Sequence, residues 1–116
     1  MHQRRARQLA VRLMNLYLGR SWKFEWFYNK ESDHWADCDV EQYIIRLNKD
    51  LVSEESVAHV RDTILHEIAH ALAPHDDVEH HSHRWKRIAS DIGALPVASK
   101  YSSKTHPLSW KRKSME

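Results

Sequence analysis

Residues 66–70 read His-Glu-Ile-Ala-His, and this spacing constrains the fold more than any other feature of the chain. Side chains four residues apart lie one above the other on the same face of an α-helix. Two imidazoles placed in this way can bind one metal ion, and a carboxylate beside the first lies close enough to hold a water on it. The pattern therefore predicts a helix with a zinc site whose ligands are His66 and His70.

Glu67, which directly follows the first ligand, predicts the chemistry of the site. Zinc lowers the pKa of a bound water toward neutrality, and Glu67 would take the proton as that water attacks a carbonyl. The alternative is an ordinary helix with two exposed histidines. Against it, Ile68 and Ala69 are apolar, as expected for a buried helix, and six of the ten histidines fall between residues 66 and 83. We therefore favour a metal site, with Glu67 as the catalytic base.

A catalytic zinc usually has three protein ligands, so a third residue is needed. An acidic residue of a later helix, such as Asp91, is one candidate. His81 and His83 are better placed, because they lie at the start of the next predicted helix.

Three helices are predicted from apolar periodicity and end signals. The first covers residues 3–18 and ends at Gly19. The second carries the histidine pair, with Ser53 as its N-cap, and stops at Pro74. The third runs over residues 82–92 and ends at Gly93.

Three short strands are predicted between the first two helices. Residues 22–28 are aromatic-rich and alternate, so Trp22, Phe24 and Trp26 are expected to face the core. Residues 34–40 form a weaker candidate, and residues 43–47, Tyr-Ile-Ile-Arg-Leu, are β-branched and apolar. Together they predict a small antiparallel sheet of about three strands.

Length and composition favour one domain over residues 1–98, followed by a basic tail over residues 99–116. Cys38 is the only cysteine, so no internal disulfide can form. No apolar run is long enough to span a bilayer, and the basic first residues lack the pattern of a secretory signal. We therefore expect a cytoplasmic protein without a membrane partner. The sequence carries no signal for a particular oligomeric state.

Charge is unevenly distributed along the chain. Residues 1–30 hold seven basic residues and one acidic, residues 31–83 three basic and thirteen acidic, and residues 84–116 eight basic and two acidic. Basic ends around an acidic middle allow DNA contact through the termini, and solvated termini are the alternative.

The runs DTILHEIAHAL and HSHRWKRIASDIGA, with the preceding YIIRLNKDLV, resemble the SprT-like family of zinc metallopeptidases over residues 22–94. In that family a third histidine lies four residues before an aromatic residue, which corresponds here to His81 and Trp85. A glycine is common where this chain has His80, so His80 and His83 stay open as alternatives to His81. The resemblance implies protein or peptide substrates, with proteins on DNA as one candidate class.

The predicted fold is thus α+β and zincin-like, with the sheet packed on the helix of residues 66–70. An N-terminal helix and a later helix carrying the third ligand complete it. Residues 43–47 are the candidate edge strand for aligning a substrate peptide. The second hypothesis is a non-enzymatic zinc-stabilised module that binds nucleic acid, but a structural site has no need of Glu67.

The sequence also carries expectations for five residues outside the proposed ligand set. His59 lies two helical turns, about 10 Å, before His66 and is too far away to bind the same ion. Asp62 and Thr63 are candidates to orient a ligand imidazole. Trp85 is expected to fix the last helix by packing, and Cys38 to be buried rather than reactive.

Overall fold

The computed structural model describes residues 1–31, 34–73 and 82–95. The described part contains four helices and three strands, which confirms the predicted α+β class. In chain order they are α1 (Gln3–Leu18), β1 (Lys23–Phe27), β2 (Ala36–Asp39), β3 (Ile44–Asn48), α2 (Lys49–Val52), α3 (Val57–Leu72) and α4 (His83–Ile92). The predicted tail of residues 99–116 lies outside the described residues.

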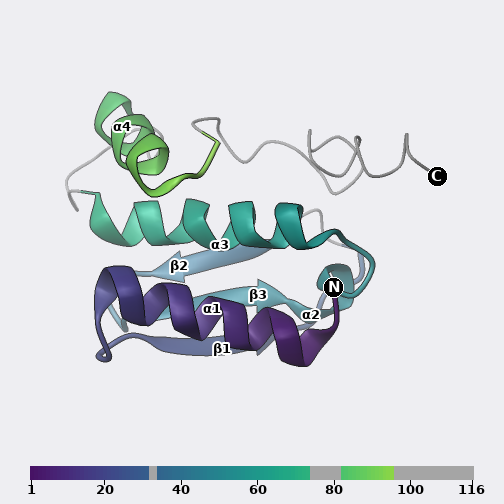
Figure 1. Ribbon diagram of the computed structural model, residues 1–116. Coiled ribbons are helices and arrows are strands. Elements are labelled where there is room, and N and C mark those ends of the chain that lie inside the picture. The colour runs from purple at the N-terminus through teal and green to yellow at the C-terminus, as the bar shows by residue number, and fades with distance from the viewer. Residues whose placement is uncertain (32–33, 74–81, 96–116) are drawn as a thin grey trace.

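The helices and the sheet form two layers with the core between them. Figure 1 shows α1 and α3 side by side on one face of the sheet, with α4 packed on α3. Trp22, Phe24 and Trp26 pack against this core, as predicted from their alternation. None of the helices in residues 1–31, 34–73 and 82–95 has the length and apolar character needed to cross a membrane.

The sheet is mixed, with strand order β1-β3-β2. β2 pairs antiparallel to β3, but β1 pairs parallel to it, so the prediction of an antiparallel sheet is wrong for that pair. The strand sequences explain the order. β3 buries Ile44, Ile45 and Leu47, and so apolar a strand is best accommodated in the centre of a sheet. β2 carries two aspartates, a composition that suits an edge.

The prediction that residues 43–47 form an edge strand is also wrong, because β3 pairs on both sides. One free edge belongs to β2. The backbone N–H of Asn48 donates to the carbonyl of Trp35 at 2.8 Å, and the register then runs from Ala36 opposite Leu47. In an antiparallel ladder this alternation directs the peptide groups of Ala36 and Cys38 away from β3.

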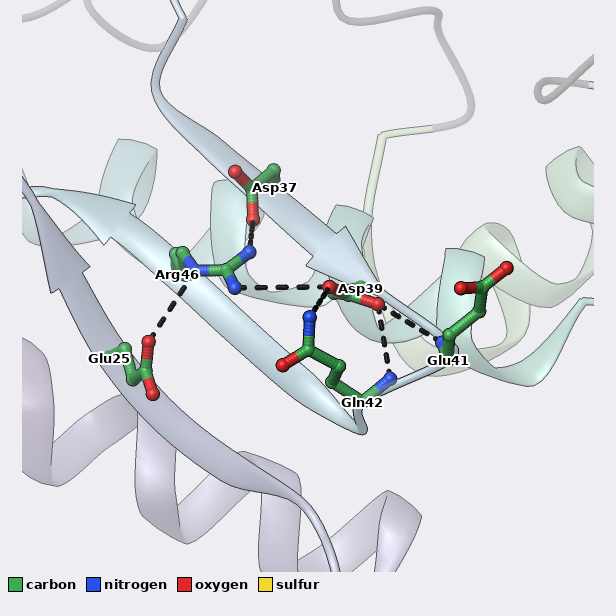
Figure 2. A network of polar contacts seen from close by, with 6 residues as sticks. All are labelled: Glu25, Asp37, Asp39, Glu41, Gln42 and Arg46. Carbon is green, nitrogen blue, oxygen red and sulfur yellow. Dashed lines mark hydrogen bonds and ion pairs between the residues drawn. The ribbon is translucent and has the colours of Figure 1, made fainter.

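The outer face of the sheet carries a polar network around Arg46 (Figure 2). Its guanidinium donates to the Asp37 carboxylate at 3.0 Å and forms longer ion pairs with Glu25 at 3.5 Å and Asp39 at 3.8 Å. Asp39 also accepts hydrogen bonds from the backbone and the side chain of Gln42. The network therefore joins all three strands and the β2–β3 turn.

Helix α1 spans the residues predicted for it. Ala6 and Ala10 are fully buried, and their small side chains allow α1 to lie close to α3. Gly19 ends the helix with a φ of 80°, a value that glycine adopts without strain. Leu16 lies on the outer side of this helix and is 70% exposed.

The start of α3 differs from the prediction. Ser56, not Ser53, is the N-cap, and its hydroxyl accepts the backbone N–H of His59 at 3.1 Å. The reason is the short helix α2, which the sequence pattern did not reveal. Asn48 caps α2 by accepting the backbone N–H of Asp50, so Ser53 lies at the end of α2.

The predicted ends of the last two helices are confirmed. Ala73 follows α3 in an extended conformation, as expected for a residue before proline. Ser82 caps α4 through a hydrogen bond from the backbone N–H of Trp85, and Gly93 ends it at a φ of 93°. Because both caps are local, their signals were visible in the sequence.

Candidate metal centre

His66 and His70 face each other on the last half of α3. Their Nε2 atoms lie 3.2 Å apart and their ring centroids 4.9 Å apart. His66 is buried and His70 is half-buried. Helical spacing therefore brings the two imidazoles together as the sequence predicted.

The distance between the two nitrogens fits a shared metal ion. Two nitrogens bound at 2.0–2.1 Å to a tetrahedral ion lie about 3.3 Å apart. Three ligand atoms lie within 4.8 Å of one another, one from each of His66, Glu67 and His70. Imidazole nitrogens with a carboxylate oxygen suit zinc and other divalent transition ions. The residues present thus fit a bound metal ion.

Glu67 is buried beside the histidines, and its environment holds the acid form. Burial raises the pKa of its carboxyl to about 8, and the charge of Asp37 adds to the rise. A nearby cation has the opposite effect, because it favours the ionised carboxylate. A carboxyl balanced in this way can accept a proton and return it near neutral pH.

Strand β2 packs against α3 beside Glu67, a proximity that the sequence did not predict. The pKa of the Cys38 thiol rises to about 12, mainly through burial and next through the charge of Glu67. Asp37 and Asp39 contribute smaller effects of the same sign. The half-buried thiol therefore stays protonated at ordinary pH, and the low reactivity of Cys38 stays a prediction.

Trp85 reaches the histidines from α4 and is fully buried. Its ring centroid lies 4.6 Å from that of His66 and 5.3 Å from that of His70. From the sequence, Trp85 was expected only to fix α4 by packing. The spacing of His81 and Trp85 was the available signal, but it did not show which residues the indole contacts.

The predicted third ligands have different outcomes. His81, and the alternative His80, lie outside the described residues. His83 is the first residue of α4, and its side chain is exposed. Asp91 is exposed near the other end of α4. The described residues therefore bring together His66, Glu67 and His70, and the third ligand stays a prediction.

The remaining candidates of α3 have other partners. His59 is buried and shares a 3.0 Å hydrogen bond with the Glu55 carboxylate. The Thr63 hydroxyl donates to the carbonyl of His59, and the Asp62 carboxylate accepts the backbone N–H of Leu95 at 2.7 Å. These bonds tie α3 to its own first turn and to the end of α4.

Comparison with known proteins gives one match. The model of the SprT-like family matches residues 6–109. This range contains every described strand, the histidine pair and α4. No curated protein and no solved structure matches the chain.

Proposed function

Because the chain belongs to the SprT-like family, we propose that it is a zinc-dependent metallopeptidase that hydrolyses peptide bonds in proteins. The observation that carries the proposal is the convergence of His66, Glu67 and His70 within 4.8 Å on one buried helix. The fold would then be zincin-like, with α3 as the active-site helix.

His81 is proposed as the third ligand. It directly precedes Ser82, whose hydroxyl accepts the backbone N–H of Trp85 at 3.3 Å. The indole of Trp85 lies against both His66 and His70. The first residues of α4 therefore lie one helical turn from Trp85, which contacts His66 and His70. This supports a third ligand just before the helix. Because the side chain of His83 is exposed, His81 is the better candidate of the two.

The reaction would divide between the metal and Glu67. A bound zinc ion would supply Lewis acidity, polarising the scissile carbonyl and making a water more acidic. Glu67 would take a proton from the attacking water and deliver it to the nitrogen of the departing amine. Its burial excludes competing bulk water, and its raised pKa in the metal-free chain suits the return of the proton.

The free edge of β2 is proposed to align the substrate. The peptide groups of Ala36 and Cys38 point away from β3, so an extended peptide could pair with them. β2 packs against α3 and lies close to Glu67. The charge of Asp37 on β2 raises the pKa of Glu67, and the charge of Glu67 raises the pKa of Cys38 on β2. A peptide added there would lie beside the catalytic carboxyl.

The test compares Glu67→Gln with Glu25→Gln, which makes the same change on the outer face of the sheet. Zinc content and hydrolysis of casein are measured for both. Glu67→Gln should keep zinc and lose about 100-fold or more of the activity, whereas Glu25→Gln should resemble the wild type. Full activity in Glu67→Gln would contradict the proposed mechanism.

A second candidate function is nucleic-acid contact through α1. Its exposed side carries Arg4, Arg5, Arg7 and Arg12, and α1 contains no acidic residue. None of these arginines forms an ion pair with another residue of the described part. A row of unpaired guanidinium groups suits the phosphates of a nucleic acid.

The test measures the affinity for a single-stranded DNA oligonucleotide by fluorescence anisotropy at several salt concentrations. One variant replaces Arg4, Arg7 and Arg12 by Gln. Its control replaces Arg84, Lys86 and Arg87 of α4, which removes the same charge. The α1 variant should bind more weakly and with a smaller salt slope. Equal effects in both variants would contradict a specific role for α1.

The same assays separate an enzyme from a binding module. Binding that survives in Glu67→Gln, together with a zinc-loaded wild type that hydrolyses nothing, would favour a non-enzymatic module. Loss of hydrolysis alone in Glu67→Gln favours the peptidase.

A further inference from the structure

We infer that Trp85 is a positioning residue of the metal centre, whose indole holds the imidazoles of His66 and His70 with their Nε2 atoms turned toward one ion. The inference rests on the proposed metal site. It assigns part of the metal affinity to α4, a helix that supplies neither of the two paired ligands.

The three rings contact one another in pairs. Trp85 lies at 61° to the His66 ring and at 30° to the His70 ring, and the two imidazoles lie at 68° to each other. The indole thus forms one wall shared by both ligands. Since it is fully buried, it is fixed by packing and does not move with the solvent.

The indole can restrict the ring orientation of both histidines, which the helix alone does not fix. Helical spacing brings the two histidines to one face, but the ring torsion of histidine is broad and nearly two-fold. A half-turn of either ring would exchange Nε2 for Cε1 and remove a ligand atom from the site. Restricting both rings before the ion arrives reduces the entropy lost on binding.

Trp85 is itself held in place through α4. Ser82 caps the helix at the backbone N–H of Trp85, and Ala89 is buried one turn later. Beyond the end of α4, the backbone N–H of Leu95 donates to the Asp62 carboxylate of α3 at 2.7 Å. α4 is therefore anchored to α3 beyond Trp85, so the indole keeps its place over the histidine pair.

Trp35 provides a matched control within the same protein. It is also buried, and its ring centroid lies 4.4 Å from that of His59 on the first half of α3. His59 is paired with Glu55 and is not one of the proposed ligands. A substitution of Trp35 therefore removes an equally large aromatic contact to a histidine of α3, but not one to the metal centre.

The experiment compares Trp85→Leu and Trp85→Phe with Trp35→Leu and Trp35→Phe in the full chain. The zinc dissociation constant is measured by competition with a chromophoric chelator, and the visible spectrum of the Co²⁺ form reports the coordination geometry. Circular dichroism first establishes that each variant is folded at the assay temperature.

Trp85→Leu should weaken zinc binding about tenfold or more and change the Co²⁺ spectrum. Trp85→Phe, which keeps a smaller ring, should fall between Trp85→Leu and the wild type. Both Trp35 variants should lose stability but keep the zinc affinity and the Co²⁺ spectrum of the wild type. If a leucine variant does not fold, the two phenylalanine variants make the same comparison.

The outcomes separate this inference from the proposed function. A wild type that takes up no zinc would overturn the metal site, and the positioning role with it. A wild type that binds zinc, with unchanged affinity and spectrum in the folded Trp85 variants, would overturn only the positioning role. Equal weakening by Trp35 and Trp85 substitutions would also overturn it, because the effect would then follow stability.

Discussion

His59 and Glu55 form a buried pair, 3.0 Å apart, two helical turns before the histidines of the metal centre. α3 therefore carries histidines in two different environments. His59 is hydrogen-bonded to a carboxylate and lies against the ring of Trp35, whereas His66 and the half-buried His70 face each other and the ring of Trp85. Their substitution should have separable effects.

His59→Ala should destabilise the protein without removing its metal. The change leaves the Glu55 carboxylate buried without this partner and opens a space under Trp35, at a cost of about 3 kcal/mol. Urea unfolding measures the loss, and elemental analysis measures the zinc. A folded His59→Ala protein that no longer holds zinc would contradict the separation between the two sites.

Glu67→Gln should stabilise the metal-free protein increasingly as the pH rises from about 4.5 to about 8. The folded chain raises the pKa of Glu67 from 4.5 to about 8, so in this window the native state keeps a proton that the unfolded state releases. The wild type therefore loses stability with rising pH, by at most about 1.4 kcal/mol per pH unit, and glutamine does not.

The free energy of unfolding of both proteins is measured by denaturant titration across this range in the presence of a chelator. Taking the difference between them removes the titration of the histidines, which both proteins share. The difference should level off above about pH 8. A difference that does not vary with pH would contradict the assigned environment of Glu67.

Cys38 should resist thiol reagents while the protein is folded. Its pKa rises from 9.0 to about 12, so the reactive thiolate is scarce at pH 8. The greater nucleophilicity of a more basic thiolate offsets only part of this loss of thiolate. The reaction with a disulfide reagent should therefore slow by about 100-fold relative to the chain in urea. Equal rates in the folded and unfolded states would show that the thiol is accessible and ionised.

Arg46→Met should cost about 1 kcal/mol of stability, a typical value for a partly exposed ion-pair network. The loss should shrink at high salt, because ions screen the repulsion left between Glu25, Asp37 and Asp39. Arg12→Met is the control, since Arg12 is exposed on α1 and has no ion pair within the described residues. A salt-independent loss would assign the effect of Arg46 to packing alone.

Features that depend on neighbouring residues were predicted from the sequence more accurately than features that depend on distant ones. α1 and α4 were predicted closely because Gly19, Ser82 and Gly93 act on their own neighbours. The start of α3 was misplaced because Ser53 and Ser56 are both good caps. Only the formation of α2, capped by Asn48, decides between them.

The sheet order depended on longer-range competition. The strands were located from alternation and β-branching, but pairing β1 with β3 in parallel requires that β3 take the centre. That choice reflects how much apolar surface each strand buries, which is settled only when the layers assemble. A local pattern of five residues does not contain this information.

The same division applies to the metal centre. His66 and His70 could be paired from helical spacing alone, because both lie on one helix. The contacts of Trp85 with them, and the proximity of Glu67 to Cys38 and Asp37, join separate elements. The position of His81 in the ligand set was inferred from family resemblance and stays a prediction.

The most direct test of the central claim is the zinc content per chain of the purified wild type, His70→Ala, His81→Ala and His83→Ala. One zinc per wild-type chain and per His83→Ala chain, lost in His70→Ala and in His81→Ala, is the predicted result. Wild-type protein that contains no zinc and takes up none on addition would contradict the metal centre and the peptidase built on it. Zinc kept by His81→Ala and lost by His83→Ala would move the third ligand to His83.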